Sequence, residues 1–442
     1  MTQPAVIILG IDTPIGLTLV RELGQNAVPV YGIGATRRAV GLYSRYLRRG
    51  YVHPDRNDDT IALLNRIARQ HHADYLMTVS ENDILFLNAH ASEMPRLQRL
   101  FPTTDLLNRV LDKASACRDA SQVGLNVPDC LTIDSPDQLT NLTDRLTYPV
   151  ILKWARPADV LPQLQARNLP FLKAEYCHDV DGLRRALERY VDLGTFPMIQ
   201  SFCPGVGLGQ MVLMHHGQAV LKFQHRRLHE WPPEGGVSTL CQSVPLSQHA
   251  DLFDKSIALL QRMKWEGLAM VEYRYDPQQD RAVFMEVNGR FWGSQPLAYH
   301  AGVHFAYATY QTQALGRLPQ QPHYRPNLRC RYTIPDTKRL ARILFQPQTI
   351  QNQTLRFNKL AEVATFLTTT LTPTTRHYVA TWHDPKPALA DLYHATKKAT
   401  RILVNVAAGA SPAVCPPQKT QSTHQPRLKP NAFTHPGTPC HK

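Results

Sequence analysis

The beginning of the chain alternates short apolar runs with amphipathic stretches. Apolar runs at 5–9, 28–33 and 75–79 are typical of buried strands, and a helical pattern follows the first run through Leu23. Residues 59–70 repeat apolar positions at helical spacing. Strands that are separated by helices predict a parallel sheet in an α/β fold.

The middle of the chain continues with shorter elements. Further strands are expected at 148–153, 171–176 and 198–203, a hairpin at 211–214 and 219–224, and helices at 180–190 and 252–263. A helix is also expected to carry residues 111–116. Residues 154–172 are rich in Pro, Gln, Asn and Arg, and this composition predicts a mobile loop.

The end of the chain changes character. Residues 335–410 carry basic helical patterns without a recognisable motif, and 388–406 places apolar residues at helical spacing. Those apolar positions are 389, 392, 399, 402, 403 and 406. We expect a helix docked on the body of the protein; the alternative is a helix that lies on a membrane surface. Residues 411–442 have seven prolines, four Lys/Arg and no acid, so this tail is expected to be disordered.

Composition and charge narrow the class of protein. The length of 442 residues and a hydrophobic content of 43% predict a globular chain of about two or three domains. Lys and Arg outnumber Asp and Glu by 49 to 35, so the formal net charge is +14. A basic balance is compatible with nucleic acid, anionic lipid or acidic small molecules. No compact Lys/Arg block is interleaved with aromatic residues, so we expect no nucleic-acid partner.

Cysteine spacing and the N-terminus indicate the compartment. The eight cysteines are scattered without a CxxC pair, which argues against a zinc site or a disulfide framework. Free thiols fit a reducing, cytoplasmic compartment. The first residues have no basic segment ahead of the apolar run, so no signal peptide is expected. No apolar stretch reaches about 18 residues, so no membrane span is expected either.

The most informative segment is an acidic hairpin. Residues 271–276 and 282–290 alternate and are rich in Val, Tyr and Phe, and the turn-like segment 277–281 separates them. If Asp276 pairs with Ala282, the register places Glu272 opposite Glu286. Like charges directly opposite one another destabilise a sheet. The arrangement is explained if a cation lies between the two carboxylates.

The period of a strand adds two further groups to this face. Glu286, Asn288 and Arg290 project to the same side, together with Glu272. Three hard oxygen donors of this kind suit Mg²⁺, and a guanidinium beside them suits a phosphoryl oxygen or a carboxylate. The alternative is a solvated strand face with ordinary surface charges.

The same segment carries a family resemblance. Met285–Ser294 resembles the ExNxR signature of the ATP-grasp superfamily, and the similarity is greatest to bacterial carboxylate–amine ligase-like proteins, which include D-aspartate ligases. Carbamoyl-phosphate-synthase-like ATP-grasp proteins are related to this group. The resemblance covers about residues 1–320 in order. It implies a pre-ATP-grasp α/β domain at 1–105 and an ATP-grasp domain at 106–320. Pattern and composition add a basic, mostly helical region at 321–410 and the disordered tail at 411–442.

The resemblance implies a nucleotide and a metal. Glu272, Glu286 and Asn288 match the residues that hold two Mg²⁺ ions, or Mn²⁺ in their place, on the phosphates of ATP. Arg290 matches the arginine that contacts the transferred phosphoryl group. With Lys153, it forms the catalytic pair that the resemblance implies.

Further positions match nucleotide-binding residues of the family. Lys113 and Lys153 match lysines that reach the phosphates, and Lys173 is the candidate for a third. The adenine hinge corresponds to Gln200, Ser201, Phe202 and Cys203. The backbone of Ser201 and Cys203 is expected to pair with the adenine edge. The chain departs from the family pattern in three places: Ser replaces a common Glu at 201, no acid follows the hinge, and the glycine-rich phosphate loop is missing after the Lys153 strand.

Residues 223–239 resemble the substrate loop of this group. Arg226 and Arg227 could clamp an anionic acceptor together with a Gly-Gly turn and a hydroxyl group. The residues of that turn and hydroxyl are Gly235, Gly236 and Ser238. The alternative is a basic hairpin that ends in a proline-containing turn.

Taken together, these features predict an ATP-dependent ligase. It activates a small-molecule carboxylate as an acyl phosphate and joins it to a small-molecule amine. A non-catalytic basic scaffold, or a binder of anionic polymers, is the alternative. A scaffold of that kind is expected to have lost one of Glu286, Asn288 or Arg290, and the chain has all three. A third interpretation, an NAD(P)-linked oxidoreductase, is based only on the glycine-containing turn at 10–16. The sequence carries no signal for an oligomeric state.

Overall fold

Five parallel strands form the first sheet of the computed structural model, which describes residues 3–142, 146–155, 157–172 and 174–407. Their order is β3 (Arg49–Val52), β2 (Val30–Gly34), β1 (Ala5–Leu9), β4 (Ala73–Thr78) and β5 (Gln98–Arg99). The helices of this part are α1 (Pro14–Gln25), α2 (Asp58–His71), α3 (Glu81–Ala89) and α4 (Thr104–Leu111), with 3₁₀ turns η1 (Val40–Tyr43) and η2 (Ala91–Glu93). The predicted parallel α/β sheet is confirmed.

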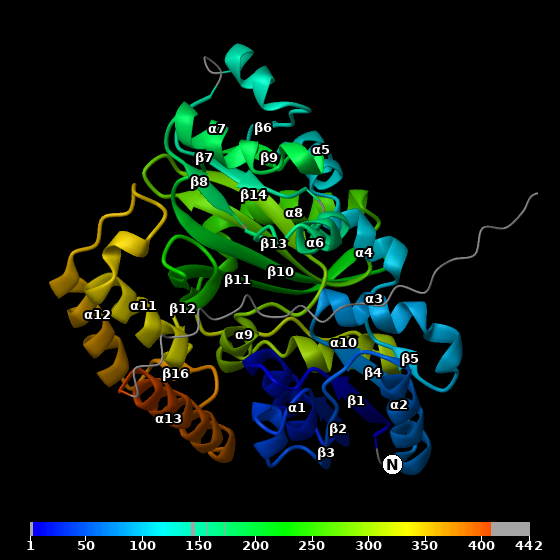
Figure 1. Cartoon of the computed structure of the whole chain (residues 1–442). Coiled ribbons are helices and arrows are strands. Elements are labelled where there is room, and N and C mark those ends of the chain that lie inside the picture. The colour runs from blue at the N-terminus through cyan, green and yellow to red at the C-terminus, as the bar shows by residue number, and fades with distance from the viewer. Residues whose placement is uncertain (1–2, 143–145, 156, 173, 408–442) are drawn as a thin grey trace, which may run out of the picture.

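A seven-stranded sheet forms the centre of the molecule (Figure 1). Its order is β14 (Arg281–Asn288), β13 (Gly267–Asp276), β10 (Val206–His215), β11 (Gln218–Trp231), β12 (Val237–Ser243), β15 (Arg329–Arg331) and β16 (Arg376–His377). All neighbours are antiparallel except β15 and β16. Each strand exchanges its hydrogen bonds with the next, so the acidic hairpin β13–β14 lies at one edge of a continuous sheet.

A smaller antiparallel sheet lies above this edge (Figure 1). Its strands are β6 (Cys130–Leu131), β9 (Met198–Ser201), β7 (Val150–Lys153) and β8 (Glu175–Cys177), with α6 (Pro157–Ala166), α7 (Val180–Glu188), η3 (Pro136–Asn141) and η5 (Val191–Leu193) beside it. The predicted strand at 171–176 therefore begins later, at Glu175. Two sheets that face each other across the β13–β14 hairpin provide walls for a site.

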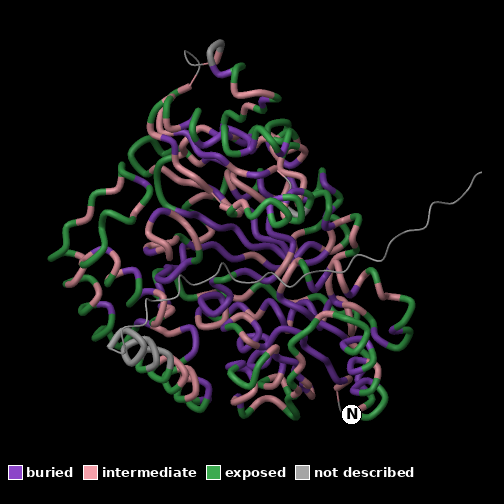
Figure 2. The backbone as a smooth tube through the Cα atoms, in the orientation of Figure 1, coloured by how far each residue is buried: buried purple, intermediate pink, exposed green. Residues whose placement is uncertain are grey.

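Helices cover both faces of the seven-stranded sheet. On one face, α9 (Gln295–Ala301) and α10 (Phe305–Leu315) share an apolar core with α1 of the first sheet. On the other face, α5 (Lys113–Gln122) and α8 (Ala250–Arg262), preceded by η6 (Leu246–His249), enclose a second core. Figure 2 shows the sheet as a buried band between exposed layers. This packing makes the sheet a rigid platform for the side chains at its edge.

Residues 154–172 are not the continuous loop that their composition predicts. Helix α6 (Pro157–Ala166) lies within this stretch. Val160 and Leu164 are one helical turn apart and pack into a small apolar cluster with Tyr190. The loop prediction is wrong because these two apolar residues are enough to fix one side of a short helix.

The expected helix at 111–116 is two helices. α4 ends at Leu111 and α5 begins at Lys113. The side chain of Asp112 caps α5, because its Oδ1 accepts a hydrogen bond from the backbone N–H of Ser115 at 3.1 Å. The cap places Lys113 in the first turn of a helix.

Three helices form the C-terminal region, α11 (Thr333–Phe345), α12 (Lys359–Leu371) and α13 (Lys386–Ala407), with η7 (Pro347–Thr349) between the first two. α13 lies against η1, where Tyr43 Oη and His394 Nε2 are 3.4 Å apart. Leu389 and Leu392 are nevertheless exposed. The apolar stripe that predicted docking therefore faces solvent where its side chains are described.

Two further expectations concern the end of the chain and the membrane. The predicted disordered tail, 411–442, lies outside the described residues. Within the part of the chain that the structure describes, no helix has the length and apolar character that crossing a membrane requires.

Glu22 of α1 is buried where the first sheet meets α9 and α10. Its Oε2 accepts hydrogen bonds from the backbone N–H groups of Ala306 at 2.7 Å and Tyr307 at 3.2 Å. Gln295 donates to its Oε1 at 3.0 Å. Burial outweighs these contacts and raises the pKa of Glu22 to about 8.

This pKa makes stability depend on pH. A carboxyl group with a raised folded-state pKa stabilises the fold below its unfolded pKa, and this contribution is lost as pH rises toward the folded value. We therefore expect the melting temperature of the unchanged chain to fall relative to Glu22→Gln as pH rises from about 5 to 8. The exposed Glu93→Gln is the matched control. Parallel melting curves for Glu22→Gln and the unchanged chain would contradict this.

Candidate active site

The acidic hairpin has the predicted pairing at its centre. Glu272 of β13 lies directly opposite Glu286 of β14. The expected pairing of Asp276 with Ala282 is wrong, because Asp276 pairs with Arg281. A β-bulge between Glu272 and Tyr273 shifts the register by one residue and restores the opposition of the two glutamates.

The side chains of Glu286, Asn288 and Arg290 follow one another along one face. Asn288 Nδ2 donates to Glu286 Oε1 at 3.3 Å, and Arg290 donates to Asn288 Oδ1 at 3.0 Å. The Arg290 guanidinium also lies 3.2 Å from the carboxylate of Glu81, at the start of α3. The structure thus brings Glu286, Asn288 and Arg290 together, as the period of the strand requires.

Glu272 belongs to an adjoining network of charges. Arg227 of β11 donates to Glu272 Oε2 at 2.6 Å and to Glu230 Oε1 at 3.0 Å. Arg274 donates to Glu230 Oε2 at 3.0 Å. Burial alone would raise the pKa of Glu230, but Arg274 and Arg227 hold it below its ordinary value. Two carboxylates and two guanidiniums therefore alternate at the edge of the site.

Both predicted phosphate lysines lie near this face. Lys153 ends β7 in the smaller sheet, and Lys113 begins α5. Burial is the main cause that lowers the pKa of the Lys153 ammonium, followed by the charge of Lys113, whereas Glu286 acts to raise it. Two cations and a carboxylate are thus close enough to sense one another's charge. Two neighbouring ammonium groups are favourably placed for a polyanion such as a triphosphate.

The hinge residues run along β9 and past its end. Gln200 is buried and pairs with Cys130 and Ile151 across the sheet. The N–H of Ser201 donates to Asp129 O at 2.9 Å, so this amide is already engaged. A hinge contact from Ser201 therefore depends on its carbonyl oxygen, which lies 3.7 Å from Cys203 Sγ.

The remaining hinge residues, Phe202 and Cys203, follow the end of β9. The ring of Phe202 is 6.3 Å from that of Tyr176 on β8. Burial raises the pKa of the Cys203 thiol, and Lys153 acts against that shift. The hinge, Lys153 and Glu286 consequently line one region between the two sheets. Lys173, the third candidate lysine, lies outside the described residues.

The predicted substrate loop is a β-hairpin, β11–β12. Arg226 and Arg227 are consecutive in β11 and project to opposite faces. Arg226 is exposed and donates to Gln242 Oε1 at 2.9 Å, whereas Arg227 faces Glu272. The expectation that the two arginines form one clamp is therefore not supported by their positions.

The turn of this hairpin approaches the smaller sheet. Gly235 has a φ of +133°, a conformation that favours glycine. A Cβ atom at Gly236 would lie 2.3 Å from Trp231 O, so only glycine fits. Tyr176 Oη donates to Glu234 O at 2.6 Å. Ser238 is buried at the start of β12. The turn therefore closes one side of the region that contains the lysines.

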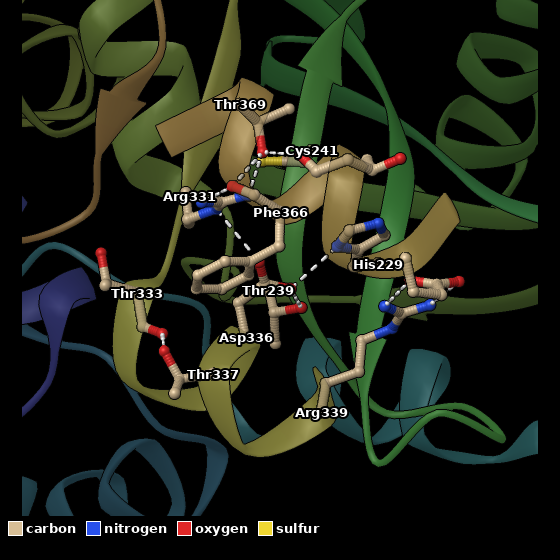
Figure 3. Close-up of polar contacts among 12 residues, drawn as sticks. His229, Thr239, Cys241, Arg331, Thr333, Asp336, Thr337, Arg339, Phe366 and Thr369 are labelled. Atoms are coloured by element: carbon tan, nitrogen blue, oxygen red, sulfur yellow. Dashed lines mark hydrogen bonds and ion pairs between the residues drawn. The ribbon is translucent and has the colours of Figure 1, made fainter. Parts of the chain in front are cut away.

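A buried polar cluster joins this hairpin to the C-terminal helices (Figure 3). Asp336 of α11 accepts a hydrogen bond from Thr239 at 3.0 Å and lies 2.9 Å from His229 Nδ1. Arg331 forms an ion pair with Asp336 at 3.0 Å. Because His229 directly precedes Glu230 in β11, this cluster supports the strand that carries the charge network.

Sequence reasoning missed Arg274 and Asp336 as contributors. Arg274 could have been found, since it lies two residues from Glu272 and shares its side of the strand. No local spacing in the sequence could have pointed to Asp336, because it lies 107 positions from its partner His229.

The residues present fit Mg²⁺ by the chemistry of their donors. Glu272, Glu286 and Asn288 offer hard oxygen ligands on the hairpin, and the positive charge of Lys153 is close enough to interact with Glu286. The carboxylates match the charge of Mg²⁺ and the cations match the charge of a polyphosphate. A site with both kinds of group suits the Mg²⁺–polyphosphate complex better than Mg²⁺ or the polyphosphate alone.

The antiparallel sheet that carries the acidic hairpin and the smaller antiparallel sheet above it have the arrangement that an ATP-grasp fold predicts. Residues 241–319 match the family model of the carbamoyl-phosphate synthase L chain, ATP binding domain. The predicted ATP-grasp resemblance and the fold class are thereby confirmed. No protein of curated function matches the sequence.

Solved structures agree on the fold. Biotin carboxylase from Campylobacter jejuni has a TM-score of 0.58 and 15% identity, over 74% of this chain and 75% of that chain. N5-carboxyaminoimidazole synthetase from Staphylococcus aureus has a TM-score of 0.54 and 12% identity, over 73% and 81%. L-amino acid ligase from Bacillus licheniformis has a TM-score of 0.52 and 14% identity, over 71% and 74%. At these identities the likeness concerns the fold.

Proposed function

We propose that the chain is an ATP- and Mg²⁺-dependent ligase that activates a carboxylate as an acyl phosphate and joins it to an amine. The observation that carries this proposal is the opposition of Glu272 and Glu286, with Asn288 on the same face and Lys153 close enough to Glu286 for that charge to act on its pKa. The similar solved structures include an ATP-analogue complex of a biotin carboxylase and an L-amino acid ligase.

The reaction requires a carboxylate to become a good electrophile. A carboxylate oxygen attacks the γ-phosphorus of ATP, the bond to ADP breaks, and an acyl phosphate forms. The amine nitrogen then attacks the acyl carbon, phosphate leaves with the C–O bond pair, and the nitrogen loses a proton. Bound Mg²⁺ supplies charge neutralisation on the phosphates.

The chain's own residues bind and orient the reactants. Glu272, Glu286 and Asn288 hold the metal, and Lys113 and Lys153 bind the phosphate oxygens. Arg290 neutralises the transferred phosphoryl group, and its contacts with Asn288 and Glu81 fix its position.

We also propose that the reaction takes place in the cytoplasm. The six cysteines in the described part of the chain are free thiols, which suits a reducing compartment. The cysteines are Cys117, Cys130, Cys177, Cys203, Cys241 and Cys330. ATP and amine substrates are both available in the cytoplasm.

ADP release from the purified chain tests the proposal. We expect one class among a panel of amino acids and small carboxylic acids to stimulate ADP release in the presence of Mg²⁺. When hydroxylamine replaces the amine, it should attack the acyl phosphate and give a hydroxamate of that acid. If ATP binds but every carboxylate in the panel leaves ADP release at its background rate and yields no hydroxamate, the ligase proposal is wrong.

A further inference from the structure

The positive charge of the chain is concentrated in its C-terminal part. Residues 321–442 contain 17 Lys/Arg and 4 Asp/Glu, whereas residues 1–320 contain 32 and 31. Residues 321–442 therefore contribute +13 of the formal charge of +14. The ATP-grasp part is close to neutral and does not need this charge for its own site.

The four acids of this region are turned inward. Asp336 pairs with Arg331, Glu362 with Arg339 at 2.6 Å, and Asp384 with Arg21 of the first sheet at 3.0 Å. The fourth acid, Asp391, is half-buried on α13. The described exposed cations of the same region include Lys338, Arg356, Lys359, Lys386 and Lys397. The outer charge of the described C-terminal helices is therefore positive.

Helix α12 buries the polar side chain of Thr369 and exposes leucines. Thr369 and Thr370 accept hydrogen bonds from Arg331, whose guanidinium lies over the ring of Phe366 (Figure 3). On the opposite side, Leu360 is 83% exposed and Leu371 is 78% exposed. Leu367 lies between them at helical spacing and is also exposed. Burial of an apolar face usually holds a helix in place, so this exposed leucine stripe needs another explanation.

Helix α13 repeats the pattern. His394 faces the body of the protein at Tyr43, whereas Leu389 is 66% exposed and Leu392 is also exposed. α12 and α13 lie on the same flank of the molecule (Figure 1). We call the outward leucines of the two helices the leucine face. Its members are Leu360, Leu367, Leu371, Leu389 and Leu392.

We propose that the leucine face and the surrounding cations dock the protein on an anionic lipid surface. Leucines that enter the boundary of the acyl chains, with Lys and Arg around them at the level of anionic headgroups, match the two components of such a surface. A second copy of the chain would bring two positive faces together, which is unfavourable. Nucleic acid would be matched by several aromatic stacking residues, whereas the described exposed large apolar side chains of α12 and α13 are five leucines and one aromatic residue, Tyr393.

The docking surface is separate from the ligase site. The leucine face belongs to α12 and α13, and the hairpin β13–β14 lies at the far edge of the seven-stranded sheet. The surface is therefore independent of ATP turnover, and changes to it should leave the reaction unaltered.

Co-sedimentation of the full chain with vesicles tests this surface. The probes are vesicles of phosphatidylcholine mixed with phosphatidylglycerol, and vesicles of phosphatidylcholine alone. We expect sedimentation with the anionic vesicles only, weakened by added salt. Replacing the five leucines of the face by glutamine should lower the partition coefficient at least about tenfold. Leu318→Gln, at a position 61% exposed outside the face, is the matched control and should bind like the unchanged chain.

Three results would overturn the proposal. The unchanged chain could stay in the supernatant with anionic vesicles. The five-leucine variant, with an unchanged circular dichroism spectrum, could bind them as well as the parent. Sedimentation velocity without lipid could show a dimer that the leucine variant loses, in which case a second copy covers the face.

Discussion

Glu286→Gln is expected to lower carboxylate-dependent ADP release by about 10²–10³-fold while the chain stays folded. The substitution keeps the size of the side chain and its contact with Asn288, but it removes the charge that faces Glu272 across the hairpin. Glu286 is also a carboxylate whose charge raises the pKa of Lys153. Loss of the Glu286 charge weakens Mg²⁺ binding, and it removes an interaction that stabilises the charged form of Lys153.

Glu188→Gln is the matched control, because Glu188 is an exposed glutamate on α7. Initial rates of ADP release and melting temperatures should be measured for both variants. Glu188→Gln should keep the rate of the unchanged chain. A Glu286→Gln variant with an undiminished rate would remove Glu286 from the proposed metal site, whatever the substrate.

Asp336→Ala is expected to lower the free energy of unfolding by about 3–5 kcal/mol. The change removes a buried carboxylate between His229 and Arg331, and the Arg331 side chain is 0% exposed. A buried guanidinium without its counter-charge is costly, so most of the loss comes from Arg331. Urea titration followed by circular dichroism measures the effect.

The pH dependence of the destabilisation separates this network from a simple loss of packing. Burial acts to raise the pKa of Asp336, but His229 and Arg331 hold it below its ordinary value. A depressed carboxylate stabilises the fold above its unfolded pKa, and that contribution is lost as pH falls. The destabilisation by Asp336→Ala should therefore shrink at acidic pH. The exposed Asp254→Ala is the control, and an equal loss in both variants would argue against the network.

The sequence predicted the centre of the site better than its surroundings. Alternation in 282–290 was sufficient to place Glu286, Asn288 and Arg290 on one side, because the period of a strand depends only on the backbone. The opposition of Glu272 and Glu286 was also predicted, but from an Asp276–Ala282 pairing that the structure does not have. A bulge corrected the register, and bulges leave no reliable trace in one sequence.

Tertiary contacts explain what the sequence did not predict. α6 forms because Val160 and Leu164 meet Tyr190, which lies in the turn between α7 and η5. The pairing of Arg227 with Glu272 required knowledge that β10 separates β11 from β13 in the sheet. Local patterns report the period of an element, whereas its neighbours are set by the whole fold.

A crystal structure of the chain with Mg²⁺ and a non-hydrolysable ATP analogue tests the central claim most directly. The account predicts that the triphosphate lies between Lys153 of β7 and the β13–β14 hairpin, with Mg²⁺ bound by Glu286 and Asn288. A nucleotide bound elsewhere, or a metal without an oxygen ligand from Glu272, Glu286 or Asn288, would contradict it.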